Sequence, residues 1–260
     1  MNGVLAITAV APLLSEPRLQ SAQVTQLVLG EAAELLETSG PMFRVRTRLD
    51  AYEGWIHRGY VTIMPMGEVE AWLVNAAWSG GALLSCRDAT RLRAPHRARL
   101  VSEGRGRVRL PRGETAEIVD GTVSPYGDMI TTCSARSPEE WAWGAFGGVP
   151  YLWGGITSGG IDCSGLVQMT FILRGVPLPR DSREQARHGQ VIEPGKQRPG
   201  DLLFFRGTDH ETIDHVAFFA AADTLIHSTI ETGGVTREPW DAGSRAEPLR
   251  ERLVAVRRLT

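Results

Sequence analysis

The segment from Tyr151 to Val167 holds the residues best suited to covalent chemistry. It reads Tyr-Leu-Trp-Gly-Gly-Ile-Thr-Ser-Gly-Gly-Ile-Asp-Cys-Ser-Gly-Leu-Val, with Cys163 at the predicted start of a helix. Free backbone N–H groups and the positive end of the helix dipole favour a thiolate there, so we expect a lowered cysteine pKa. Glycine on both sides lets the backbone approach a ligand closely. The alternative is a buried structural cysteine beside a glycine-rich connector.

A cysteine nucleophile needs a base and a group that orients the base. His215 begins the apolar run 216–220, and His227 ends the run 225–227. A hairpin centred on Ala221 would place residue 215 opposite 227, with Cβ atoms about 4.5–5.5 Å apart. One histidine is then a candidate base and the other its partner. A different loop register would break this pairing and leave two unrelated histidines at strand ends.

The elements that must position these residues alternate between helices and strands from about residue 134. Helices are predicted over 138–146, Cys163 to Arg174 and Ser182 to His188, each followed by a glycine that ends it. Ser137 to Glu140 has the pattern of an N-cap, a proline at N1 and a capping-box Glu, and Asp181 is expected to cap the third helix. Strands are expected at 201–205, 216–220, 224–228 and 252–257.

The first 125 residues contain short β-type runs separated by turn residues, which predict small antiparallel barrels. Met1 to Pro17 has the pattern of a first β-strand rather than a secretory signal, because a basic n-region is missing. The stretch 62–81 is either a linker or part of a second barrel.

Chain length, net charge and cysteine count exclude several classes of function. The chain has 260 residues and a formal net charge of −2, with dispersed basic residues that form no nucleic-acid surface. It has no run of about 18 apolar residues, so we expect no membrane span and a cytoplasmic protein. Three cysteines without a C-x-x-C pair argue against disulfides and a zinc site, and Cys86 has the pattern of a buried apolar residue.

Taken together, the second half resembles the NlpC-type cell-wall cysteine peptidases, which have a papain-like fold. The resemblance covers about 134–260 and lies in five motifs: Tyr151-Leu-Trp-Gly-Gly, Asp162-Cys-Ser-Gly165, Pro179-Arg-Asp-Ser182, Pro199-Gly-Asp-Leu-Leu-Phe-Phe205, and His215-Val216 with a downstream His227. It implies Cys163 as nucleophile, His215 as general base and His227 as the residue that orients the base. It implies neither a metal nor a cofactor.

The same resemblance extends to substrate-binding residues. Tyr151 matches a tyrosine near the oxyanion region and Trp153 an aromatic wall, while Ser164 belongs to the cysteine motif. Asp162 and Ser182 match residues that line the cleft in members binding a free peptide amine, which a carboxylate can hold by a charge-assisted contact. A simple helix N-cap is the alternative role for Asp162, and Asp201, in a turn before a strand, is expected to be structural.

The segment Val28 to Tyr60 resembles a bacterial SH3-like barrel, with a Gly30-Glu31 turn followed by Asp50-Ala-Tyr-Glu-Gly-Trp-Ile56. Residues 82–125 resemble a second, more diverged copy of such a barrel, which lacks the Gly-Trp strand. The expected architecture is α+β: barrels at 1–65 and 66–130, then a papain-like domain at 131–260.

This order of domains resembles the γ-D-glutamyl-L-diamino acid endopeptidases, which cleave murein peptides with a free N-terminal L-Ala. In those enzymes the first barrel blocks one end of the cleft, and Tyr60 is our candidate for a barrel residue that holds the amine; a core or rim tyrosine is the alternative. The expected partner is a murein-derived peptide, and the expected state is a monomer. A wall amidase or acyltransferase on the same fold, and a non-catalytic wall-binding protein, are the competing functions.

Overall fold

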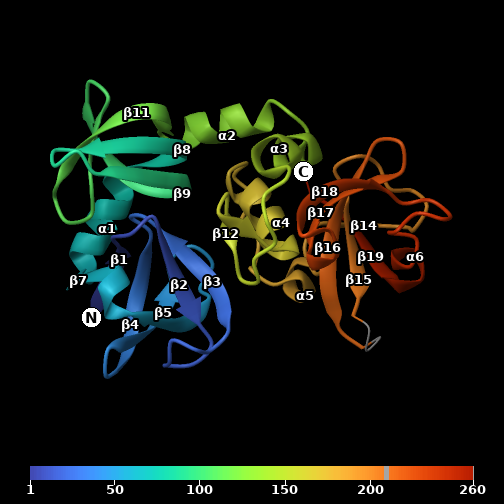
Figure 1. Ribbon diagram of the computed structural model, residues 1–260, viewed down its shortest axis with the longest axis horizontal. Helices are drawn as coiled ribbons and strands as arrows, with labels where there is room; N and C mark the ends of the chain where they lie inside the picture. Colours follow the sequence, from blue (N-terminus) through green and yellow to red (C-terminus); the bar gives the residue numbers. More distant parts are fainter. Residues whose placement is uncertain (208–210, 260) are drawn as a thin grey trace. The chain divides into compact units, whose positions relative to one another are not determined.

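The computed structural model describes residues 1–207 and 211–259. The chain divides into two compact units, Met1–Ile130 and Thr131–Thr260 (Figure 1). The first unit is built almost wholly from strands, whereas the second combines helices with an antiparallel sheet. The predicted α+β class, with small β-barrel-like modules ahead of a papain-like domain, is confirmed.

Seven short strands form the first sheet of the first unit. They are β1 (Asn2–Ala6), β2 (Val10–Leu14), β3 (Gln23–Val28), β4 (Ala32–Ser39), β5 (Met42–Thr47), β6 (Glu53–His57) and β7 (Val61–Pro65), in the order β3-β2-β6-β5-β4-β1-β7. Alternate residues point into one core, which contains Val4, Leu13, Leu27 and Val45. Met1–Pro17 therefore holds two strands where the sequence predicted one, because the chain bends between β1 and β2.

The second sheet of this unit is a closed barrel in the order β10-β11-β8-β9. Its strands are β8 (Ala76–Cys86), β9 (Arg91–Gly104), β10 (Arg107–Arg109) and β11 (Thr115–Ser124). The stretch 62–81 is neither only a linker nor only barrel, since it contains the unpredicted helix α1 (Met66–Asn75). This helix is held by tertiary packing: Val69 and Trp72, three residues apart on one face, are buried.

The two sheets of the first unit meet at the Leu29-Gly30-Glu31 turn. Gly30 has a φ of +76°, and a Cβ atom on it would lie 1.9 Å from the carbonyl oxygen of Arg99 in β9. The Arg99 amide donates to the Leu29 carbonyl at 2.8 Å. Glu31 and Arg97 form a buried ion pair beside this contact, with 2.6 Å between Oε1 and Nε. The glycine therefore provides both a left-handed turn and the close approach of two backbones.

The second unit is built around a six-stranded antiparallel sheet in the order β14-β19-β15-β16-β17-β18. These strands are β14 (Gln190–Ile192), β15 (Leu202–Arg206), β16 (Ile213–Ala220), β17 (Thr224–Thr229), β18 (Gly234–Pro239) and β19 (Leu253–Arg258). A two-stranded ribbon of β12 (Ile156–Thr157) and β13 (Gly160–Ile161) precedes them in the chain. Four of these strands, β12, β13, β14 and β18, were not predicted from the sequence.

Helices cover the sheet of the second unit. They are α3 (Pro138–Phe146), α4 (Cys163–Ile172), α5 (Ser182–Gln185) and α6 (Leu249–Arg252), and the unpredicted α2 (Tyr126–Ser134) leads into them. Every residue of α4 is buried, and the helix contacts β16 and β17 (Figure 1). Phe171 of α4 stacks on Phe218 of the sheet. None of the helices in 1–207 and 211–259 is long and apolar enough to cross a membrane.

The predicted helix caps hold only in part. Helix α3 has the predicted bounds, but the Ser137 side chain donates to Glu139 at 2.7 Å instead of capping the helix, and Glu140 pairs with Arg237. Helices α4 and α5 end two and three residues earlier than predicted, and Asp181 makes no side-chain cap. The capping-box prediction was wrong because both side chains found other polar partners.

Candidate active site

A pocket of about 510 Å³ in the second unit brings the three predicted catalytic residues together. Cys163 comes from the start of α4, His215 from β16 and His227 from β17. The remaining lining residues are mostly polar or charged and come largely from the segments after β17 and β18: Tyr151, Trp153, Asp214, Ser228, Thr229, Ile230, Glu231, Arg245, Ala246, Pro248, Leu249 and Arg252.

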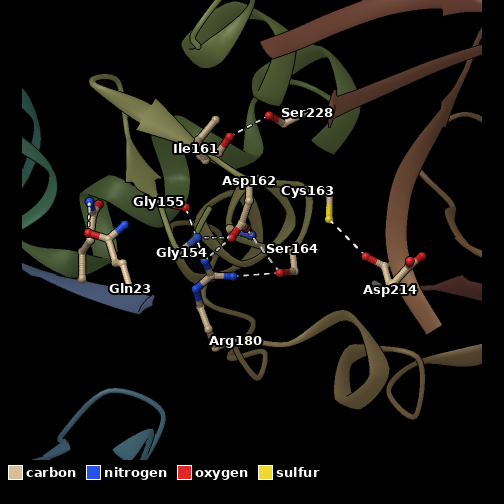
Figure 2. A network of polar contacts seen from close by, with 12 residues as sticks. Gln23, Gly154, Gly155, Ile161, Asp162, Cys163, Ser164, Arg180, Asp214 and Ser228 are labelled. Carbon is tan, nitrogen blue, oxygen red and sulfur yellow. Dashed lines mark hydrogen bonds and ion pairs between the residues drawn. The ribbon is translucent and has the colours of Figure 1, made fainter. Parts of the chain in front are cut away.

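Cys163 is the first residue of α4, and its Sγ lies 3.8 Å from the carbonyl oxygen of Asp214 (Figure 2). Burial raises the pKa of its thiol to about 12, and the negative charge of Asp162 adds to this rise, while the backbone amides of Val216 and Ser164 and the charge of Arg180 oppose it. The predicted lowered pKa is therefore wrong for the free protein. The helix end does not produce a lowered pKa because burial of the thiol outweighs it, and the Asp162 carboxylate directly before the cysteine adds to the rise.

That carboxylate belongs to Asp162, the N-cap of α4, and its contacts are with protein groups. It accepts from the amides of Gly165 at 2.7 Å and Gly154 at 2.8 Å, and Arg180 binds it at 2.6 Å (Figure 2). Asp162 is 6% exposed, Arg180 is 2% exposed, and neither lines the pocket. Asp162 thus has the N-cap role that was its alternative, and its charge is balanced inside the protein.

The two histidines meet, although the predicted hairpin register was wrong. The observed pairs are Phe219 with Leu225 and Ala220 with Thr224, which shifts the register by two residues. The loop is centred on Ala222, whose φ is 55°, rather than on Ala221. A shift of two keeps every side chain on its face of the sheet, so the rings meet diagonally, with 2.7 Å between His215 Nε2 and His227 Nδ1.

Two further residues, Glu238 and Arg245, continue the polar contacts of His227, and neither was predicted from the sequence. The Nε2 atom of His227 lies 2.5 Å from Oε1 of Glu238 in β18. The Nε of Arg245 binds the other carboxylate oxygen at 2.9 Å, and its NH2 group contacts Oε1. The sequence offers only a weak signal for this strand, the β-branched pair Val235-Thr236 after Gly233-Gly234.

His215 is a neutral base near pH 7. Burial lowers its pKa well below the usual 6.5, and electrostatic interaction with the neighbouring His227, Arg252 and Arg245 lowers it further. With a protonated thiol beside a neutral imidazole, the nucleophile must be generated by proton transfer during attack. The pocket is therefore arranged for general-base activation of a thiol, and a preformed ion pair is not its resting state.

Alkylation kinetics test this protonation state. A thiol with a pKa of about 12 has a thiolate fraction that grows roughly tenfold per pH unit, so iodoacetamide should modify Cys163 about tenfold faster per unit from pH 7 to 10. Mass spectrometry separates Cys163 from Cys86 and Cys133, and free cysteine, whose pKa is about 8.5, serves as the standard that levels off above pH 9. A plateau for Cys163 below pH 9 would contradict the raised pKa.

The remaining predicted substrate residues lie in different places. Tyr151 and Trp153 line the pocket; burial raises the pKa of Tyr151 to about 12, which keeps its hydroxyl available as a donor. Trp153 is 64% exposed at the pocket surface. Ser164 and Ser182 are buried and do not line the pocket, and the Ser164 hydroxyl accepts from Arg180 at 2.7 Å.

Tyr60 belongs to the first unit, where its side chain packs against the core of the first sheet. Its contact with substrate stays a prediction. Among the residues in 1–207 and 211–259, no group of three or more His, Cys, Asp or Glu side chains is placed to hold a metal ion.

Comparison with known proteins adds relatives for both parts of the chain. Residues 148–257 match the model of the NlpC/P60 family, and residues 13–59 match that of the bacterial dipeptidyl-peptidase Sh3 domain. An NlpC/P60 family protein from Bacillus cereus has the same fold over the whole length, with a TM-score of 0.78 at 21% identity, covering 98% of this chain and 99% of that one.

Sequence relatives match parts of the chain. The γ-D-glutamyl-L-lysine dipeptidyl-peptidase of Bacillus subtilis is 39% identical over 84 residues, which is 32% of this chain and 28% of that protein. Its namesake from Bacillus cereus is 34% identical over 125 residues, 47% and 37% of the two chains. The matched part thus spans well under half of either relative. The probable endopeptidase NlpC of Escherichia coli is 34% identical over 107 residues, which cover 41% of this chain and 68% of that protein. With its cysteine and histidines gathered in one pocket and these relatives across the matched region, the chain belongs to the NlpC/P60 family.

Proposed function

We propose that this protein is a cysteine endopeptidase that hydrolyses the bond between γ-D-Glu and a diamino acid in murein peptides with a free N-terminal L-Ala. It would act in the recycling of cell-wall peptides in the cytoplasm. The observation that carries the proposal is the meeting of Cys163, His215 and His227 in one pocket, the set that thiol-based acyl transfer requires. The relatives named dipeptidyl-peptidases support the choice of bond.

The proposed reaction begins when His215 takes the proton of the Cys163 thiol as sulfur attacks the amide carbonyl of γ-D-Glu. In this proposal, backbone N–H groups at the start of α4 and the hydroxyl of Tyr151, which lines the same pocket as Cys163, stabilise the oxyanion. The protonated His215 then donates its proton to the departing amine of the diamino acid. In the second half, His215 activates water, which cleaves the thioester and restores the thiol.

The charges around the pocket support a diamino acid as the leaving group. Such a residue carries a second amine and, at a chain end, a carboxylate. The pocket contains Asp214 and Glu231, which attract an ammonium group, and Arg252, which attracts a carboxylate. A pocket with both signs of charge fits a zwitterionic group better than an apolar side chain.

The test is incubation with L-Ala-γ-D-Glu-L-Lys and with the corresponding diaminopimelate peptide, followed by mass spectrometry. We expect release of the free diamino acid and of L-Ala-γ-D-Glu. The same peptides with an acetylated N-terminus should be cleaved at least about tenfold more slowly, because the charged amine is lost. Failure to cleave either free peptide would contradict the substrate assignment, and equal rates for acetylated peptides would contradict the requirement for a free amine.

A further inference from the structure

Beyond the three predicted catalytic residues, the polar contacts continue across the sheet. His215, His227 and Glu238 come from three neighbouring strands, β16, β17 and β18. The observed pairs are Leu225 with Glu238 and Phe219 with Leu225. His227 is two residues from Leu225 and so points to the same face as Glu238, as a diagonal neighbour. Polar contacts therefore run without a break from His215 through His227 and Glu238 to Arg245, which follows β18 in the chain.

The chemistry of Glu238 decides where the protons along these contacts lie. Although burial raises its pKa, hydrogen bonds and charges from His227 and Arg245 lower it below the usual value. The ionised carboxylate has no proton to give, so the Nε2 atom of His227 must carry a hydrogen and donate it. In a neutral imidazole the other nitrogen is then bare, so Nδ1 of His227 accepts from Nε2–H of His215.

The tautomer of His215 decides whether it can take a proton from the nucleophile. When Nε2 of neutral His215 carries the hydrogen, its Nδ1 has the free lone pair that a general base needs. We propose that Glu238, held by Arg245, is a positioning residue that fixes the tautomers of His227 and His215, so that the bare Nδ1 of His215 is available to the Cys163 thiol. On activation the S–H bond breaks and a bond from hydrogen to Nδ1 forms. The positive charge then on His215 is stabilised through His227 by the Glu238 carboxylate.

Arg245 has a defined part in this arrangement. Through Nε and NH2 it binds both oxygens of Glu238, which fixes the carboxylate plane facing His227. Its side chain is 42% exposed and lines the pocket. Without Glu238, His227 would be free to carry its hydrogen on Nδ1, and the two histidines would then present two donors to each other or reverse both tautomers. In the first case the hydrogen bond between the two rings is lost and the tautomer of His215 is no longer fixed; in the second case His215 carries its hydrogen on Nδ1 and cannot take the thiol proton.

The first experiment compares Glu238→Gln with Asp201→Asn in the full chain. Asp201 is a matched control: it is 1% exposed, Arg258 binds it through Nε and NH2, and it does not line the pocket. Kinetics on the tripeptide rest on the proposed function. We expect Glu238→Gln to lower kcat by ~10–100-fold, the cost of losing a carboxylate that orients a functional histidine, with KM within about twofold. Asp201→Asn should keep kcat. Equal losses of kcat in both variants would reduce Glu238 to a structural role and overturn the proposal.

The second experiment needs no substrate, so it separates this proposal from the proposed function. Long-range ¹H–¹⁵N correlation spectra at pH 7.5 report the tautomer of each of the six histidines, and the spectra of His215→Ala and His227→Ala assign the two of interest. We expect both to carry hydrogen on Nε2 in the wild type. Glu238→Gln should shift His227 toward the Nδ1–H form, and Arg245→Gln, at an exposed position, should shift it partly. A wild-type His215 with hydrogen on Nδ1 would overturn the proposal, even if every variant failed to fold.

Discussion

Replacing Cys163 by alanine should lower peptide cleavage by at least about 10⁴-fold, because it removes the thiol that forms the acyl intermediate. The histidines would remain in place, but they activate a nucleophile and do not replace one. Substrate binding should survive, since the mutation removes one sulfur atom. The measurement is single-turnover release of the diamino acid, with peptide binding followed separately by calorimetry.

The control for this result is Cys86→Ala. Cys86 lies at the end of β8 in the first unit, and its alkylation or loss should leave cleavage unchanged. A Cys163→Ala protein that still cleaves within tenfold of the wild-type rate would remove the covalent mechanism. Loss of cleavage in Cys86→Ala would show that the first unit contributes chemistry that the second unit does not contain.

Replacing Arg180 by methionine should destabilise the second unit by about 3–5 kcal/mol, the cost of leaving a buried charge without its partner. Arg180 is 2% exposed, and its guanidinium is the only cation bonded to Asp162 within the described residues. It also donates to Ser164 and to the Gly155 carbonyl, so its loss removes hydrogen bonds from several buried polar groups around the start of α4 (Figure 2). Hydrogen exchange of the α4 amides measures the free energy of unfolding of this unit.

Two further variants give this prediction its controls. Arg237 pairs with Glu140 at the surface, with side chains 35% and 48% exposed, so Arg237→Met should cost less than about 1 kcal/mol. The double variant Asp162→Asn with Arg180→Met removes both buried charges and should recover most of the loss. If Arg180→Met alone costs no more than Arg237→Met, the buried pair does not hold the start of α4.

The nucleophile and its histidines were predictable because their signal is local. Cys163 stands at a helix start whose glycines and apolar stripe are visible in sequence, and the histidines flank apolar runs, His215 at the start of one and His227 at the end of the other. The face of each histidine was also predictable, since alternation along a strand survives a shift of two residues. The register itself was not, because it depends on where the loop places its left-handed residues, Ala222 and Asp223.

Contacts between side chains that are far apart in the sequence could not be predicted. The thiol pKa depends first on burial and then on a carboxylate that an arginine from another segment holds in place, and neither effect is visible from the position of Cys163 at a helix start. Glu238 was missed because β18 was missed, and β18 is a strand by its pairing with β17 more than by its composition. Helix α1 was missed for the same reason, since burial of Trp72 stabilises it rather than helix propensity.

The contact between the two sheets of the first unit has a consequence for evolution. The turn at 29–31 and the strand segment at 97–99 share a buried ion pair and a backbone approach that leaves no room for a side chain at Gly30. A substitution in one segment therefore affects the other, because a change of charge leaves a buried charge unpaired and a larger side chain at Gly30 would clash with the backbone of Arg99. We therefore expect the two modules to be inherited as a pair, because recombination that exchanged one of them for a foreign module would have to import its matching neighbour as well.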